Sequence, residues 1–589
     1  MTAHWVVDDV PSTRFPIYGR GNAGEIFPNV MTPLTGSLMG SAAREGQARA
    51  LIEMGAVVPR DLGEPDRAVM SGVFGGYLHL NLSLSRLMGV RTPGMSIADI
   101  DVQMFGASDA PPYVCQRGDR SAAATLRLGR FLLRSIRGID FSALDAERKA
   151  VVSWLRDLPD LTTASDEELV EIVDTTPRWF AAHMRSLLYA SGIAGVLSAL
   201  VERLGSRRAR IDPGVIIRLT SGIGGIETTG PSLRLWELGR SVAADTVLSA
   251  HFDAGVIGLD GRLRANIDHV AVAAFVDRFD AFLDEFGSRG PDEYELASDT
   301  WGTDPSLALA AVERLRLTSP DADPVAAGVR LADERAAAAQ DVRSSIPRPV
   351  RPVLDRLLRA AGNAAIGRER AKGTLVLALY GTRRALFELA RRAQARGGPV
   401  ERRDCWLVTR EELPAFLADP PSFAELISER AARRDYLQAR VPPFVFVAPI
   451  SDPSTWPLRT ASRALALADV GDELVGLGVS PGVRRGRARV LVDPSDPGAL
   501  EPGEIMIAPI TDPAWTPLFL AAEAVVIDVG AQQSHAAIVA REIGIPAVVS
   551  VTDATSRVRD GDLIEVDGDR GIVRVLARSG DERLRPSPR

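Results

Sequence analysis

The stretch that decides the fold of the last part of the chain is Val525–Ser550, VVIDVGAQQSHAAIVAREIGIPAVVS. An apolar run at 524–527 predicts a buried strand. Ser534 stands where a helix N-cap is expected, directly before the helical stretch 536–543. A Gly-Ile-Pro sequence then ends that helix, and a second apolar strand follows it. The pattern predicts a strand–turn–helix–strand unit of an α/β domain.

His535 falls in the first turn of the predicted helix. The first N–H groups of a helix have no partner within it, and the helix dipole is positive there. An anion is therefore stabilised at this place before any side chain contributes. A histidine in this position is suited to carry a phosphoryl group on a ring nitrogen, although a helix-capping histidine without chemistry is the alternative.

The stretch resembles the phosphohistidine (mobile, swivelling) domain of phosphoenolpyruvate synthase, pyruvate phosphate dikinase and rifampicin phosphotransferase. Its pattern is roughly GGxxSHAAIVARExGIPAVV, and residues 530–549 follow it closely. The departure is Ala531, which replaces the second glycine. The resemblance implies that His535 is the catalytic residue that is phosphorylated. It also implies a set of phosphate-binding residues, namely Ser534, Gly530, Thr511 and Arg541.

Two earlier stretches resemble further parts of the same domain. They are GVSPGVRRGRARVLV at 478–492 and EIMIAPITDPAWTPL at 504–518. In the second stretch, Thr511 either caps a helix or contacts the phosphate. We therefore predict a small α/β swivelling phosphohistidine domain at 476–577, followed by a polar, flexible tail at 578–589.

Near the start of the chain, Arg14–Ser37 reads RFPIYGRGNAGEIFPNVMTPLTGS. Its prolines and glycines predict an ordered, irregular segment, and on composition alone a packed surface loop fits it. The segment resembles RxNxGExxPxxVTPLT, which opens the acceptor-binding domain of rifampicin phosphotransferase-like proteins. The resemblance implies that the acceptor site is formed by Arg20, Asn22, Glu25, Thr32 and Thr35, and that Glu227 faces the same cleft. The glycines near Glu227 lack the Lys-Ser/Thr of a phosphate loop.

Helical periodicity dominates most of the chain before residue 440, so we predict a mostly helical acceptor-binding domain at 1–440. Within it, the sequence IGRERAK places Arg368 and Lys372 four residues apart, on one helix face. A solvated charged face would produce the same pattern. The spacing also resembles the RExxK element of the family, which implies catalytic cations that reach the phosphoryl group or the acceptor. Residues 441–475 are interrupted by prolines and predict a connector or hinge.

Composition excludes several classes of protein. The net charge of −7 over 589 residues gives no support for nucleic-acid binding. Cys115 and Cys405 are far apart, which suits a reducing cytosol and no disulfide framework. With two cysteines and six histidines, the sequence argues against a metal site in this chain. We expect a cytoplasmic protein without a signal peptide or a membrane span.

Enzymes of this family usually load the histidine with an ATP-grasp domain, and neither that domain nor a phosphate loop is recognisable here. The arrangement resembles the histidine-bearing subunit of split phosphotransferases, such as phenylphosphate synthase and the 4-cresol phosphorylating system. That resemblance implies a dikinase-type reaction in which a separate ATP-grasp subunit binds ATP and Mg²⁺. Its products are a phosphorylated phenol or cresol, AMP and Pi, as in aromatic compound degradation. A phosphohistidine relay without a small acceptor, and an ATP-driven condensing ligase, are alternatives.

Overall fold

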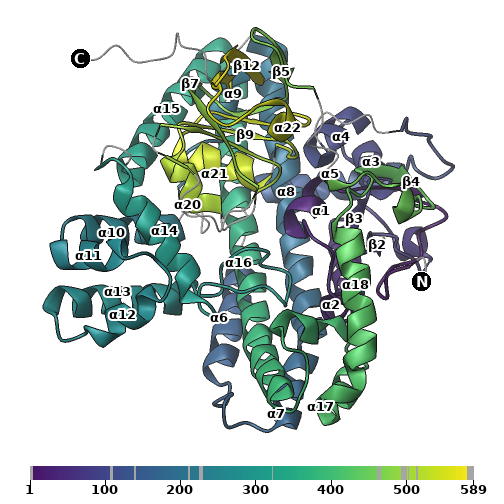
Figure 1. The fold of residues 1–589 in the computed structure, drawn as a ribbon. Helices are drawn as coiled ribbons and strands as arrows, with labels where there is room; N and C mark the ends of the chain where they lie inside the picture. Colours follow the sequence, from purple (N-terminus) through teal and green to yellow (C-terminus); the bar gives the residue numbers. More distant parts are fainter. Residues whose placement is uncertain are drawn as a thin grey trace. The chain divides into compact units, whose positions relative to one another are not determined.

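Most of the chain is described in a computed structural model. The described residues are 4–64, 66–105, 111–137, 141–209, 213–224, 230–320, 323–459, 466–492, 500–501, 503–511, 515–532 and 534–579. The chain divides into two compact units. Unit 1 comprises Met1–Val201, Asp292–Ser298 and Asp355–Arg459, and unit 2 comprises Glu202–Pro291, Asp299–Leu354 and Thr460–Arg589. A largely helical region followed by a C-terminal α/β domain confirms the predicted fold class (Figure 1).

Unit 1 is mainly helical. Its helices are α1 (Gly21–Ile26), α2 (Pro33–Glu53), α3 (Leu82–Arg91), α4 (Ile97–Phe105), α5 (Ala122–Arg137), α6 (Ser142–Arg156), α7 (Asp166–Asp174), α17 (Leu413–Ala418), α18 (Ala424–Gln438), most of α8 (Thr176–Ala209) and most of α16 (Arg351–Ala395). Short 3-10 turns are η1 (Pro59–Leu62), η4 (Arg402–Leu407), η5 (Pro420–Phe423) and η6 (Pro453–Thr455).

A small antiparallel sheet with the order β2-β3-β1-β4 completes unit 1. Its strands are β1 (Ile17–Gly19), β2 (Ser71–Phe74), β3 (Tyr77–Asn81) and β4 (Val445–Val447). β4 pairs with β1, and Phe446 lies opposite Tyr18. Since β4 falls inside the predicted connector 441–475, the first part of that connector is a structural strand of unit 1.

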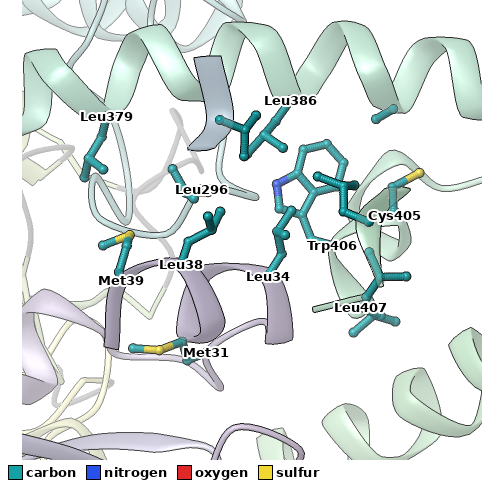
Figure 2. Packing of buried hydrophobic residues seen from close by; sticks show 14 of the residues in the cluster. Met31, Leu34, Leu38, Met39, Leu296, Leu379, Leu386, Cys405, Trp406 and Leu407 are labelled. Atoms are coloured by element: carbon teal, nitrogen blue, oxygen red, sulfur yellow. The ribbon is translucent and has the colours of Figure 1, made fainter. Parts of the chain in front are cut away.

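The core of unit 1 includes side chains of α2, α16 and η4 (Figure 2). Its buried side chains include Met31, Leu34, Leu38, Met39, Leu296, Leu379, Leu386, Cys405, Trp406 and Leu407. α2 begins at Pro33 because the Thr32 hydroxyl accepts a hydrogen bond from the Thr35 N–H, and proline suits the first helical position.

The stretch Asp166–Val201, which holds α7 and most of α8, bears on the expectation of no membrane span. By length and composition it could cross a membrane, with a mean hydropathy of 1.5 in its most apolar window. The buried core helix of a soluble protein passes the same test, and 39% of that window is buried. Phe180 and Ala181 of α8 belong to the core of unit 1.

Unit 2 contains a helical part and a sheet domain. The helical part, between residues 213 and 350 without 292–298, holds α9 (Pro213–Arg218), α10 (Gly230–Ala243), α11 (Thr246–Asp253), α12 (Leu259–Ala265), α13 (Val270–Phe286), α14 (Pro305–Leu317), α15 (Pro324–Ser345) and η3 (Arg348–Val350). Its core includes a row of rings on one face of α13, at Phe275, Phe279 and Phe282.

The sheet domain, residues 466–579, has eight strands in the order β5-β12-β11-β7-β8-β9-β10-β6. They are β5 (Glu473–Val475), β6 (Leu477–Ser480), β7 (Val483–Val490), β8 (Ile505–Ala508), β9 (Ala524–Ile527), β10 (Ala547–Val549), β11 (Leu563–Asp567) and β12 (Ile572–Ala577). β7 to β10 run parallel to one another. The domain also contains α20 (Thr516–Ala521), α21 (His535–Ile543) and α22 (Ala554–Arg557).

The boundaries of the compact units differ from those of the predicted divisions, which are 1–440, 441–475 and 476–577. Residues 202–291 and 299–354 group with the sheet domain in unit 2. The sheet domain itself begins earlier than predicted, since β5 lies before residue 476. Of the predicted tail 578–589, the last ten residues lie outside the described part of the chain.

Candidate active site around His535

The predicted strand–turn–helix–strand unit is present as β9, α21 and β10. Ser534 is the N-cap of α21, with φ −65° and ψ 160°, and its Oγ accepts a hydrogen bond of 3.2 Å from the Ala537 N–H. His535 is therefore the first residue of the helix. Gly544 ends the helix in the left-handed conformation, at φ 81°. Local sequence thus fixes both ends of α21 and the place of His535.

The His535 ring lies between two threonine hydroxyls and is 8% exposed. Its Nδ1 is 3.3 Å from the Thr511 Oγ1, and its Nε2 is 3.2 Å from the Thr516 Oγ1. Thr511 follows β8, and Thr516 is the first residue of α20. Phe519 of the same helix meets the ring edge-on. Thr516 was not predicted, although the stretch TDPAWTPL that contains it was singled out.

The loop before Ser534 is closely packed. A side chain on Gly530 would come within 2.9 Å of the Val549 Cβ, so only glycine fits. The Gly530 carbonyl accepts a hydrogen bond from the Ser550 hydroxyl. The methyl group of Ala531, where the family pattern has glycine, is buried, and the Ala531 carbonyl accepts from the Ser534 N–H at 3.0 Å. The departure at Ala531 is therefore accommodated in the loop.

Arg541 supports this loop. Its Nε donates to the Ala537 carbonyl at 2.8 Å, and its Nη2 donates to the Gln532 carbonyl. The guanidinium thus links the last turn of α21 to the loop that presents His535. The structure brings Thr511 and Ser534 beside His535. Arg541 instead holds the backbone near His535, through its hydrogen bonds to the Ala537 and Gln532 carbonyls. Their phosphate-binding roles, with that of Gly530, stay predictions.

Asp528 anchors the same loop to the start of α22. It accepts hydrogen bonds from the Thr555 N–H at 3.0 Å and from the Thr555 hydroxyl. Burial raises the pKa of the Asp528 carboxyl to about 7, against the effect of these hydrogen bonds. A carboxyl whose pKa is higher in the folded state stabilises the fold at low pH, and this contribution is lost as the pH rises towards 7.

We expect Asp528→Asn to remove this pH dependence. Relative to the variant, the wild-type protein should lose roughly 1–4 kcal/mol of unfolding free energy between pH 4 and pH 7. Chemical unfolding of both proteins across that range, followed by circular dichroism, measures the difference. Parallel curves for the two proteins would contradict the assignment.

In unit 1, the two predicted threonines are engaged in structural contacts. The Thr32 hydroxyl donates to Glu295 Oε1 at 2.8 Å, and the Thr35 hydroxyl donates to the same oxygen at 2.5 Å. All three side chains are buried. These contacts hold the start of α2 against the segment Asp292–Ser298. Their acceptor-binding roles stay predictions.

Arg20 and Asn22 carry buried polar atoms. The Arg20 guanidinium lies 4.6 Å from the centre of the Tyr77 ring and donates from Nη2 to the Phe27 carbonyl at 3.0 Å. Burial lowers the pKa of Arg20 to about 10. Within the described residues, neither Arg20 Nη1 nor Asn22 Oδ1 has a hydrogen-bond partner. Buried polar atoms are normally satisfied, so these two favour a polar ligand group or a water nearby. Glu25 lies half-buried on the same helix, α1.

Arg368 and Lys372 lie on α16, but not on a solvated charged face. Lys372 Nζ is 3.8 Å from Glu293 Oε2, and Arg368 Nη2 is 3.1 Å from Glu369 Oε1. Both cations are mostly buried, and both carboxylates are buried. The solvated-face alternative is thus wrong for this pair.

The partner carboxylates Glu293 and Glu369 were not predicted. Arg383 of α16 anchors the segment that carries Glu293, because its Nη2 donates to the carbonyls of Glu293 and Glu295 at 2.8 and 2.9 Å. The acidic sequence PDEYEL at 291–296 was the available signal. Glu227, the remaining predicted residue, lies outside the described residues.

The sheet domain and its histidine define the class of protein. Residues 500–571 match the mobile domain of PEP-utilising enzymes, and residues 182–369 match the fourth domain of rifampicin phosphotransferase. The chain therefore combines a domain of the phosphohistidine type with a helical region like that of rifampicin phosphotransferase. Both parts of the predicted resemblance are confirmed at this level.

Individual relatives follow the same division. The chain is 30% identical over 598 residues to the prodigiosin synthesizing transferase PigC of Serratia marcescens, covering 97% of this chain and 64% of that protein. It is 30% identical over 311 residues to a rifampicin phosphotransferase of Streptomyces sviceus, covering 51% of this chain and 34% of that protein. An uncharacterized phosphotransferase of Bacillus subtilis, YvkC, is 28% identical over 314 residues, covering 52% of this chain and 37% of that protein.

Proposed function

We propose that this chain is a phosphotransferase that carries a phosphoryl group on His535 from ATP to a hydroxyl acceptor. In this proposal ATP and Mg²⁺ are bound by an ATP-grasp subunit, and the acceptor is a phenol- or cresol-type aromatic compound. The observation that carries the proposal is the position of His535 at the start of α21, in a domain that matches the mobile domain of PEP-utilising enzymes. The ATP-grasp partner and the acceptor rest on the sequence resemblance alone.

The chemistry balances in three steps. A neutral ring nitrogen of His535 attacks the β-phosphorus of ATP, an N–P bond forms, and AMP leaves. Water then removes the terminal phosphoryl group as Pi. Finally the acceptor oxygen attacks the remaining phosphorus, the N–P bond breaks, and the hydroxyl proton passes to a base. Such transfers depend mainly on positioning and charge stabilisation.

The two threonines fix the ring for the first step. When one hydroxyl accepts from the protonated ring nitrogen, the lone pair of the other nitrogen becomes the nucleophile. The hydroxyl beside that nucleophilic nitrogen must turn away to admit phosphorus, which needs only rotation of a side chain. Once the phosphoryl group is bound, the N-terminus of α21 and the Ser534 hydroxyl stabilise its charge.

We expect the double variant Thr511→Val and Thr516→Val to slow phosphorylation of His535 by roughly 10- to 100-fold, because each lost hydrogen bond contributes about 0.5–1.5 kcal/mol. Valine keeps the size of threonine, so the fold should persist. Rapid-quench measurement of phosphohistidine formation, with circular dichroism as the folding control, tests this. An unchanged rate would show that the hydroxyls do not orient the ring.

The acceptor would bind in unit 1. Lys372 and Arg368 would offset negative charge on the phosphoryl oxygens, while the unpartnered atoms of Arg20 and Asn22 would bind polar groups of the acceptor. Glu293 would hold Lys372 in place. Mass spectrometry of a reaction with ATP, an ATP-grasp partner and 4-cresol tests this proposal. A cresyl phosphate that requires His535 supports it, and phosphorylated His535 without any product contradicts it.

A second function is favoured by one observation. The match to PigC covers 97% of this chain, whereas the match to rifampicin phosphotransferase covers 51%. This extent favours a synthetic use of the phosphoryl group, in which the phosphorylated acceptor is attacked by a second substrate and phosphate leaves. A condensed product that contains no phosphorus would support the second function over the first.

A further inference from the structure

The loop Gly222–Gly224 in the helical part of unit 2 lies on the last turn of α21. The Ile223 N–H donates to Glu542 Oε1 at 3.0 Å, and the Gly224 N–H donates to Glu542 Oε2 at 3.2 Å. The Gly222 N–H donates to the Arg541 carbonyl at 3.3 Å. Three consecutive amides therefore bind α21, and two of them hold both oxygens of one carboxylate. Hydrogen bonds to an ionised carboxylate are stronger than those between neutral groups.

Helix α15 extends this contact through Leu331. The Leu331 side chain lies between two glycines of positive φ, Gly222 at 56° and Gly544 at 81°. A Cβ at Gly222 would lie 2.5 Å from Leu331 Cβ, and one at Gly544 would lie 2.9 Å from Leu331 Cδ2. Either side chain would displace Leu331. From the next turn, Arg335 donates to the Gly222 carbonyl and thereby fixes the loop on α15.

Three more contacts join the same parts of unit 2. Leu520 of α20 is buried in the hydrophobic cluster of α10 to α14, and Ile543 of α21 packs against that cluster. Arg218 of α9 lies 3.6 Å from Asp569, in the turn after β11. The helical part thus contacts the sheet domain at α20, at α21, which begins with His535, and at one turn of the sheet.

These contacts are noncovalent, and several are polar. The strands β5 to β12 of the large sheet all belong to the sheet domain, so separation from the helical part would break no pairing between them. The amides and the Glu542 carboxylate can exchange their mutual hydrogen bonds for water. The polar part of the contact is therefore suited to reversible attachment, whereas separation would also expose Leu520 and Ile543 to water.

We propose that α15 and the loop Gly222–Gly224 form a docking surface for the sheet domain. The Glu542 carboxylate, bound by two loop amides, is the main polar contact that holds the domain there. The bound partner is the chain's own domain, residues 466–579. In the docked state the sheet domain is bound to α15 and the loop, and it must separate from them before His535 can move to a distant site. The contact itself concerns two parts of the chain and no substrate, whereas the role of the docked state rests on the proposed function.

Hydrogen–deuterium exchange of the full chain tests the contact between Glu542 and the loop Gly222–Gly224. In Glu542→Ala, we expect amide exchange at Gly222–Gly224 and in the last turn of α21 to rise by about tenfold or more. Leu331→Ala, on the opposite side of the contact, should produce the same pattern. Glu523→Ala is the matched control. It removes an exposed carboxylate of the same domain, paired only weakly with Arg484 at 3.4 Å, and should leave these amides unchanged.

The pattern of exchange decides the outcome. Faster exchange at both faces of the contact, with β8 and β9 still protected, supports the docking surface. Unchanged exchange in both variants overturns it, and so does an equal rise throughout the strands, which would mean general unfolding. None of these readouts depends on ATP or on an acceptor, so failure of the proposed function would leave the result interpretable.

Discussion

His535→Asn abolishes phosphoryl transfer in this account. We expect product formation to fall by roughly 10⁴-fold or more, since removal of a catalytic nucleophile has effects of at least this size. Asparagine preserves a polar side chain at the first position of α21, where the ring contacts Thr511 and Thr516. The protein should therefore remain folded while losing the ring nitrogen that accepts phosphorus in the proposed function. Initial rates of phosphorylated product, with the loading subunit in excess, measure the effect.

The control for this variant is its fold. The thermal unfolding of His535→Asn should stay within a few degrees of that of the wild-type protein, because a single polar contact changes. If the folded variant still forms product at more than a few per cent of the wild-type rate, phosphorus does not pass through His535. The chain would then act in some other way than as a carrier.

Lys372→Met should separate loading from delivery. We expect phosphorylation of His535 to be unchanged, while transfer to the acceptor falls by roughly 10²–10³-fold, the range seen when one charge-stabilising group is removed. Methionine fills the volume of the lysine stem but removes the ammonium group that lies 3.8 Å from Glu293 Oε2. Single-turnover decay of preformed phosphohistidine in the presence of acceptor measures the delivery step alone.

Arg370→Met is the matched control for Lys372→Met. Arg370 lies on the same helix, but it is more exposed and forms a surface ion pair with Asp145 at 3.0 Å. Surface pairs contribute little, so both loading and delivery should be unaffected. Lys372→Arg should recover part of the delivery rate, because it restores the charge. Equal losses in the Lys372 and Arg370 variants would contradict a specific role for Lys372.

The C-terminal domain was predictable because its signals are local. A buried strand, Ser534 as an N-cap and Gly544 as a C-cap lie within about twenty residues, and each acts on its immediate neighbours. The same local rules predicted where α21 begins and hence the place of His535. The family resemblance then supplied the chemistry that these rules cannot supply.

The rest of the site depends on contacts between distant residues. Thr32 and Glu295 are separated by 263 positions, and no pattern around either residue shows that they are bonded. The segment Asp292–Ser298 belongs to unit 1 although both its flanks belong to unit 2. The sequence likewise does not show that Lys372 is buried against Glu293, because the two residues are far apart in the chain. Spacing on one helix face showed that Arg368 and Lys372 are neighbours, but not what covers them.

The attachment of the helical part to the sheet domain was likewise unpredictable. The glycines at 222 and 224 lack the Lys-Ser/Thr of a phosphate loop. In the structure, the amides of Ile223 and Gly224 bind the carboxylate of Glu542, and the Gly222 amide binds the Arg541 carbonyl. Glycine-rich loops expose N–H groups to any anion, and sequence does not show which anion is present. In this chain the anion is supplied by the chain itself.

The central claim is that His535 carries the phosphoryl group. The most direct measurement is mass spectrometry of the intact chain and its peptides after incubation with ATP and the ATP-grasp subunit, without acceptor. We predict one acid-labile phosphoryl group, located on His535 and discharged when acceptor is added. An unmodified His535 while product still accumulates on addition of acceptor would contradict the account.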